Sequence, residues 1–119
     1  MQIELASNPI RVHGPDVEFT LSDEGGAHVF MIFSIEGVDG FEHAEANKGA
    51  KSKTITLEVG KTYDSNVFFA AHAFQALNRA YDSELRANGA PVAWAKDNIP
   101  EGQASDRKSK SFKIEVVSM

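Results

Sequence analysis

Hydrophobic and polar residues alternate with a period of two in several separate stretches of this chain, and this period is typical of half-buried β-strands. The clearest examples are DVEFTL at residues 16–21, TITLEV at 54–59 and FKIEVV at 112–117. QIEL at 2–5 alternates more weakly, whereas HVFMIFSI at 28–35 is apolar on both faces, which is typical of a central strand. Sequences rich in Gly, Pro and Asp separate these stretches, so the pattern predicts short strands joined by turns.

The segment from Asn66 to Ala87 fits two different structures. It contains six alanines and no Pro or Gly, and helix propensity therefore favours one long helix over residues 66–88 that ends at Gly89. The same residues also fit two strands, because 81–87 alternate cleanly and 66–74 form an apolar run. We favour the strands, and the helix remains the alternative.

Asn88-Gly89 is the sequence of a two-residue hairpin turn between the strands on either side of it. Counting outward from this turn predicts that Leu85 lies opposite Val92 and that Ser83 lies opposite Trp94. This register places Leu85, Val92 and Trp94 on one surface that faces the core. The predicted fold is an all-β, antiparallel, immunoglobulin-like or jelly-roll β-sandwich of seven or eight strands, with an α+β domain containing the helix as the alternative.

Three sequences of the second half, KTYDSNVFFAAHAF, AYDSELRANGAPVAWA and KSFKIEVV, together resemble bacterial and phage immunoglobulin-like domains. The resemblance covers about half of the chain and consists of an order of strands, an Asn-Gly hairpin and a closing strand. It implies a β-sandwich used for adhesion, assembly or ligand display, on a phage or a bacterial surface. Loops are not shared within that class, so the resemblance implies no particular functional residue.

Length and composition indicate the number of domains, and the charge is distributed unevenly along the chain. A chain of 119 residues is predicted to form one domain over residues 1–119, and the absence of cysteine excludes disulfides, thiolate metal sites and thiol catalysis. The net charge of −5 is uneven, since residues 1–46 carry −8 and the remainder carries +3. Such a division is typical of acidic and basic strands that neighbour each other in one fold. It also predicts self-association between the two regions, weakened by salt.

Two groups of residues are candidate binding sites. Asp39, Glu42, His43 and Glu45 lie close together in a glycine-containing segment between two predicted strands, where carboxylates on a loop could bind calcium, although an ordinary solvated loop has the same composition. Tyr81 and Trp94 would form an aromatic platform for a sugar ring if the hairpin faced outward. If it faces inward, Trp94 belongs to the core.

Other functional classes have little support in the sequence. There is no nucleophile motif, no phosphate-binding glycine loop and no metal-ligand spacing, so we expect no catalytic residue, no cofactor and no metal site. The basic stretch SDRKSKSFK at 105–113 favours protection of a strand edge over nucleic-acid binding. No signal peptide or membrane-spanning run is encoded, and the localisation stays open between virion, cytoplasm and secretion.

We therefore expect a non-catalytic structural or interaction module for assembly, decoration or adhesion. Its partner would be another protein or a second copy, with carbohydrate or calcium as the alternative ligand.

Overall fold

The computed structural model describes residues 1–45, 49–73 and 79–118, and for Asp39 and residues 41–45 it describes the backbone alone. These residues contain ten β-strands and no helix, which confirms the all-β prediction. The strands are β1 (Glu4–Leu5), β2 (Ile10–Gly14), β3 (Asp16–Asp23), β4 (His28–Ile35), β5 (Val38–Glu45), β6 (Gly49–Thr56), β7 (Thr62–His72), β8 (Ala80–Ala87), β9 (Ala90–Asn98) and β10 (Ser105–Ser118).

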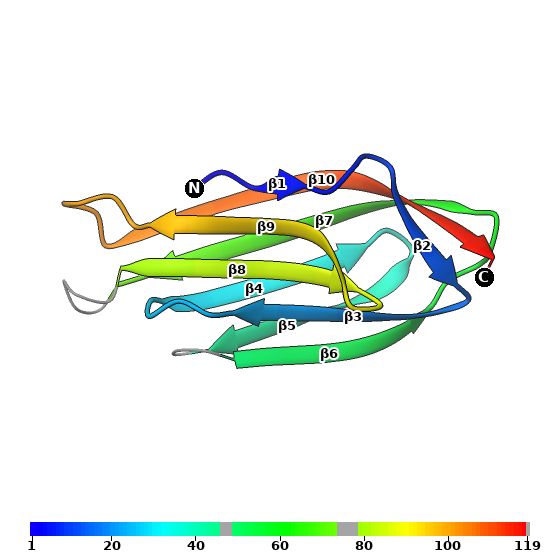
Figure 1. Ribbon diagram of the computed structural model, residues 1–119, viewed down its shortest axis with the longest axis horizontal. Coiled ribbons are helices and arrows are strands. Elements are labelled where there is room, and N and C mark those ends of the chain that lie inside the picture. Colours follow the sequence, from blue (N-terminus) through cyan, green and yellow to red (C-terminus); the bar gives the residue numbers. More distant parts are fainter. Residues whose placement is uncertain (46–48, 74–78, 119) are drawn as a thin grey trace.

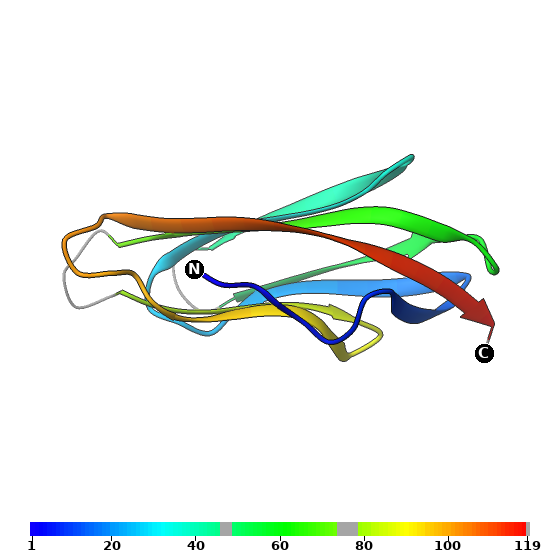
Figure 2. The same cartoon turned by 90° about the horizontal axis from the view of Figure 1, so that it is seen from above.

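The strands form two five-stranded sheets that pack face to face as a β-sandwich (Figures 1 and 2). Sheet A has the order β1-β9-β8-β3-β6, and sheet B has the order β2-β10-β7-β4-β5. The pairs between these strands are antiparallel except β2 with β10, which is parallel. The N-terminal segment crosses from sheet A to sheet B, because β1 pairs with β9 and β2 pairs with β10. The body is elongated, with extents of 47 × 22 × 21 Å.

The alternative of one helix over residues 66–88 is wrong. The residues of β7 alternate in burial, with Val67 and Phe69 in the core and Phe68 half-buried on the outer face. Strand β8 alternates in the same way, since Tyr81 and Leu85 are buried. Sheet packing therefore overrides the helix propensity of the alanines. Residues 74–78, between β7 and β8, lie outside the described residues.

The predicted hairpin is present, but its register differs beyond the first two pairs, Ala87 with Ala90 and Arg86 with Pro91. Asn88 and Gly89 both have positive φ, 51° and 82°, as a tight hairpin turn with the right-handed strand twist requires. The register shifts between Leu85 and Arg86, so that Leu85 lies opposite Ala93 and Glu84 lies opposite Trp94. The predicted pairs of Leu85 with Val92 and of Ser83 with Trp94 are therefore wrong, because a bulge inserts one residue into β9.

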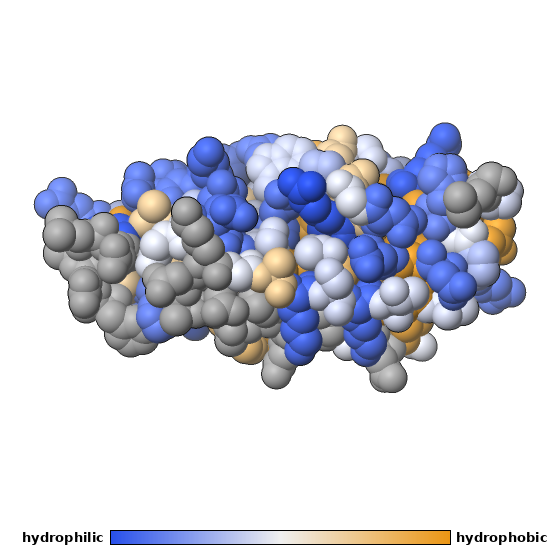
Figure 3. All heavy atoms as spheres, turned by 60° about the horizontal axis from the view of Figure 1, so that its bottom comes forward, coloured by the Kyte–Doolittle hydropathy of each residue, from blue (hydrophilic) through white to orange (hydrophobic). Residues whose placement is uncertain are grey.

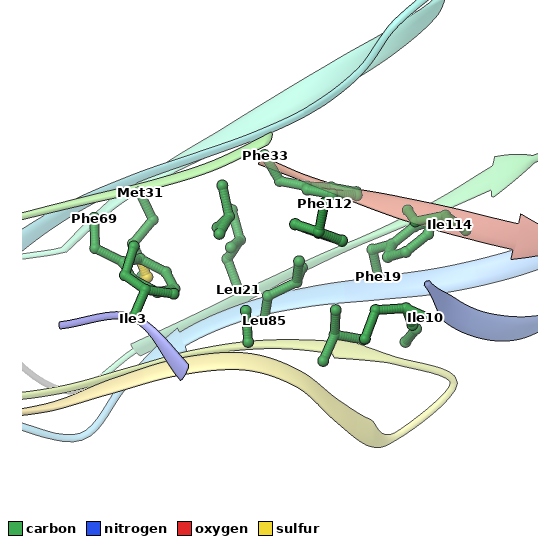
Figure 4. Close-up of a cluster of buried hydrophobic side chains, with 14 of the residues drawn as sticks. Ile3, Ile10, Phe19, Leu21, Met31, Phe33, Phe69, Leu85, Phe112 and Ile114 are labelled. Carbon is green, nitrogen blue, oxygen red and sulfur yellow. The ribbon is translucent and has the colours of Figure 1, made fainter. Parts of the chain in front are cut away.

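Three phenylalanines join the two sheets at the centre of the core (Figure 4). Phe19 comes from β3 in sheet A, whereas Phe33 and Phe112 come from β4 and β10 in sheet B. The ring centroids of Phe19 and Phe33 lie 4.7 Å apart, and those of Phe33 and Phe112 lie 6.3 Å apart. Each of these side chains is 3% exposed or less, so aromatic packing contributes beyond the area that is buried.

The described residues contain more strands than the seven or eight predicted. Strand β2 is too short for its alternation to stand out, and β5 contains glycine and acidic residues that suggested a loop. Strand β10 begins at Ser105, seven residues before its apolar alternation starts at Phe112. The missed strands and the missed extension all lie at sheet edges, where one flank of the backbone is not covered and the hydrophobic signal is weakest.

Replacement of Phe33 by alanine tests whether the aromatic contact between the sheets supports the fold. We expect Phe33→Ala to lower the free energy of unfolding by about 3–5 kcal/mol, because it leaves a cavity between two sheets. Phe30 lies on the same strand but on the outer face, 38% exposed, so Phe30→Ala is the matched control and should cost about 1 kcal/mol or less. Urea unfolding measures both, and equal losses would contradict this core.

Candidate functional site

The feature that distinguishes sheet B is an open backbone edge along the first half of β10. Strand β7 pairs with β10 from Ser105 to Glu115, whereas β2 pairs with it only from Ile114 to Ser118. Within the described part of the chain, no strand lies beside the β2-facing flank of Ser105–Phe112, which we call the open edge. The open edge lies along the upper side of the molecule in Figure 1.

Two hydrogen bonds determine which backbone groups face outward on the open edge. Ala73 donates its N–H to the carbonyl of Ala104 at 2.9 Å, so even-numbered residues of β10 bond to β7. Lys113 donates its N–H at 3.1 Å to Asn8 Oδ1 on the opposite side. By this alternation, the N–H and C=O groups of the four odd-numbered residues of the open edge point away from β7. These residues are Ser105, Arg107, Ser109 and Ser111.

The open edge is strongly basic. Arg107, Lys108 and Lys110 are exposed to solvent. Asp106 is half-buried and accepts a hydrogen bond from the hydroxyl of Tyr81 at 3.0 Å, so its charge is used within the sandwich. The amino nitrogen of Met1 also lies 2.8 Å from this carboxylate.

Lysines also occupy core-facing positions on β10. Phe112 and Ile114 are buried, and Lys108 and Lys110 follow the same alternation yet remain exposed. A charged side chain on the inner side of an edge strand opposes accidental pairing with another chain. The prediction that this basic stretch accompanies a strand edge therefore agrees with the position of the lysines. The same charges would attract an acidic strand.

At the end of the open edge, Lys113 forms an ion pair with Asp64 of β7. Its Nζ lies 2.7 Å from Asp64 Oδ1, and the hydrogen bond and charge of Asp64 raise the pKa of Lys113. Both side chains are well exposed, so the pair contributes little to stability. It neutralises one lysine and leaves Arg107, Lys108 and Lys110 as the accessible cations of this edge.

The opposite edge of sheet B is β5, and the acidic candidate residues lie on it. Asp39, Glu42, His43 and Glu45 are backbone members of an eight-residue strand, so the prediction of a loop between two strands is wrong. Register with β4 places Glu42 opposite Ile32. Their side chains lie outside the described residues, and the calcium prediction stays a prediction. Among the side chains that are described, no three metal-ligating residues cluster.

Tyr81 and Trp94 lie on opposite faces of sheet A and do not form a common platform. Tyr81 is 1% exposed in the core, where burial and its hydrogen bond to Asp106 raise the pKa of its hydroxyl. Trp94 is half-buried on the outer face, with Glu4 and Glu84 as its cross-strand neighbours. The prediction that Trp94 belongs to the core with Leu85 is therefore wrong, because the bulge reverses its side.

The outer face of sheet B carries an apolar stripe that the sequence analysis missed. Phe30 lies opposite Ala70, and Ile32 lies opposite Phe68, across β4 and β7. Strand β4 is central, between β7 and β5, as its apolar residues predicted, but Phe30 on its outer face is 38% exposed. A polar groove of about 280 Å³ lies farther along the same strands; its polar lining residues are Ser34, Glu36, Asp64, Ser65, Asn66 and Ser111. On the side of the molecule shown in Figure 3, most of the surface that is coloured by hydropathy is hydrophilic.

One buried carboxylate, Asp23, was not identified from the sequence. It is fully buried at the end of β3, and its Oδ1 accepts hydrogen bonds from the N–H groups of Gly25 and Asp82 and from the Ser83 hydroxyl. Its Oδ2 has no hydrogen-bond partner among the residues that the structure describes. Burial raises the pKa of Asp23 against the lowering effect of these three donors. Gly25 is required beside it, since a Cβ there would lie 2.3 Å from the carbonyl oxygen of Ala80.

Comparison with known proteins gives no relative. No protein-family model, no curated protein and no solved structure matches this chain. No helix in the described ranges is long and apolar enough to cross a membrane.

Replacement of Asp23 by asparagine tests the effect of this buried charge. The raised pKa means that the folded protein binds a proton more tightly than the unfolded chain, whose carboxyl has a pKa of 3.8. The contribution of Asp23 to the free energy of unfolding is therefore largest below pH 3.8. It falls as the pH rises through the pKa that Asp23 has in the folded protein. We expect Asp23→Asn to remove this fall, so that its stability relative to the natural chain improves with pH.

Urea unfolding of both proteins from pH 3 to pH 7 measures the difference. The control Asp23→Ala also removes the charge but leaves three donors without their acceptor, so we expect it to be less stable than Asp23→Asn by about 1–3 kcal/mol at every pH. A difference between Asp23→Asn and the natural chain that does not change with pH would contradict the effect of the charge.

Proposed function

We propose that this chain is a non-catalytic interaction module that binds an extended acidic segment of a protein along its open edge. The observation that carries the proposal is the unpaired flank of Ser105–Phe112 in β10. Backbone groups on such a flank recognise another strand by hydrogen bonding and need no reacting side chain. Arg107, Lys108 and Lys110 add a preference for acidic sequences.

The number of backbone hydrogen-bonding groups on the open edge limits the strength of this binding. Four residues each present one N–H and one C=O on the open edge, which allows at most eight hydrogen bonds. At about 0.5–1.5 kcal/mol net for each, the gain only moderately exceeds the cost of association. We therefore expect weak binding that becomes effective at high local concentration, as in an assembled or surface-displayed array.

The finer fold assignment is part of the proposal. An immunoglobulin-like or jelly-roll sandwich is supported by two packed sheets with crossing connections. The closing strand β10 lies beside β7, whereas the intervening hairpin of β8 and β9 belongs to the other sheet. In an immunoglobulin sandwich the last two strands, F and G, are neighbours. On this evidence the chain would be a variant of those architectures, and an assembly or adhesion role does not depend on the choice between them.

A labelled peptide of alternating glutamate and valine tests the proposed binding. We expect its fluorescence anisotropy to rise as the full chain is added, and this rise to weaken with salt because exposed charges are screened. The double variant Lys108→Glu with Lys110→Glu should abolish the rise. The variant Lys61→Glu with Lys96→Glu changes the net charge by the same amount, but at two exposed residues outside β10. It should bind the peptide like the natural chain.

A second control is the same peptide with alternate backbone nitrogens methylated on its bonding side. It keeps the charge but cannot donate hydrogen bonds to the open edge, so its binding should be lost. Equal binding of the methylated peptide, or no binding of either peptide at any salt concentration, would contradict the proposal.

A further inference from the structure

We propose that the partner of the open edge is β5 of a second copy, so that sheet B continues from one molecule into the next. This inference rests on the proposed function and names its partner. It follows from four properties of the two edges: their positions, directions, lengths and charges.

The two edges are on opposite sides of the same sheet. Strand β5 ends the order β2-β10-β7-β4-β5, and the open edge lies at the other side, beyond the end of β2 pairing. Figure 1 places β10 along the upper side of the molecule and β5 along the lower side. A copy stacked in the same orientation therefore brings its β5 beside the open edge of its neighbour.

Directions and lengths of these strands match. Strand β10 is antiparallel to β7, β7 to β4 and β4 to β5, so β10 and β5 run in opposite directions. Stacked copies in one orientation would consequently form an antiparallel ladder, which is the more stable kind. Strand β5 has 8 residues, and the open edge from Ser105 to Phe112 is equally long.

Some backbone groups of β5 are also available on its outer flank, although the carbonyl of Gly40 accepts a hydrogen bond from Lys53 Nζ at 3.3 Å. Glu36 donates its N–H to the carbonyl of Asp64 at 2.8 Å, so even-numbered residues of β4 bond to β7 and odd-numbered ones bond to β5. Residues of β5 that lie opposite even-numbered β4 residues therefore direct their N–H and C=O groups away from the sheet. Glu42, opposite Ile32, and Ala44, opposite Phe30, are in this position.

The charges select this pairing over symmetric ones. Strand β5 contains three acidic residues and no Lys or Arg, for a net −3. The open edge from Ser105 to Phe112 contains three basic residues and one acidic residue, for a net +2. Two β5 edges repel each other, and so do two open edges, whereas β5 and the open edge attract. Pairing between unlike edges is heterologous, and it builds linear chains of molecules in place of closed dimers.

A charge exchange between the two edges tests this arrangement. In one variant, Glu42→Lys with Glu45→Lys makes both edges basic, and in the other, Lys108→Glu with Lys110→Glu makes both edges acidic. Sedimentation velocity measures mass over a range of protein concentrations in about 0.01 M and about 1 M salt, where the Debye lengths are about 30 Å and 3 Å. A single chain has a mass of 13.0 kDa.

We expect the natural chain to exceed the single-chain mass at high concentration in low salt and to return to it in high salt. Each variant alone should remain a single chain. An equimolar mixture of the two should associate again, because each basic β5 then meets an acidic β10 and each acidic β5 meets a basic β10. This recovery also shows that both variants are folded.

The variant Lys61→Glu with Lys96→Glu is the matched control, and it should associate like the natural chain. A natural chain of constant single-chain mass, or a mixture that stays at single-chain mass, would overturn the proposal. Binding of the glutamate-valine peptide without self-association would overturn the second copy as partner and leave the open edge as a binding site. The proposed function is tested separately, because a chain that does not bind the glutamate-valine peptide contradicts it.

Discussion

Strand β10 is longer than β2, its partner on one flank. This difference in length leaves the backbone of the first half of β10 exposed to solvent on that flank. Of its 14 residues, β2 covers only those from Ile114 to Ser118, whereas β7 pairs along the strand from Ser105 to Glu115. Backbone N–H and C=O groups are obligatory hydrogen-bonding groups, so an uncovered flank must be bonded to water or to another strand. The protein thus keeps half of one strand as core structure and leaves the other half open.

The core fixes where the open edge lies. Phe112, Ile114 and Val116 enter the space between the sheets, and Phe112 stacks with Phe33 across the width of sheet B. A shift of β10 by one residue would turn all three side chains toward solvent and would lose their burial. Because the buried half cannot slide, the lysines of the other half keep fixed positions relative to β7. Packing in the core and charge at the edge are therefore consequences of one register.

The sequence predicts those parts of the fold in which one face of a strand is buried and the other is solvated. Asn88-Gly89 was found by its turn chemistry, but the register beyond it depended on a bulge that no residue type announces, and Trp94 was placed on the wrong face for that reason. Strand β5 and the first half of β10 contain few apolar residues to alternate, so both were interpreted by charge alone. The acidic and basic character of the two regions was evident, whereas their positions on opposite edges of one sheet required the pairing of strands distant in sequence. Asp23 was missed because burial of a carboxylate at a strand end depends on donors from β8.

Amide hydrogen exchange along β10 tests the open edge most directly. In dilute protein at high salt, the N–H groups of Arg107 and Ser109 should exchange fast, and those of Lys108 and Lys110, which bond to β7, should exchange slowly. In concentrated protein at low salt, the exchange of Arg107 and Ser109 should slow, since a second strand then covers them. Uniformly slow exchange of all four amides in dilute protein would show that this flank is already covered. Fast exchange of Arg107 and Ser109 that persists at high concentration would show that no strand of a second copy pairs there.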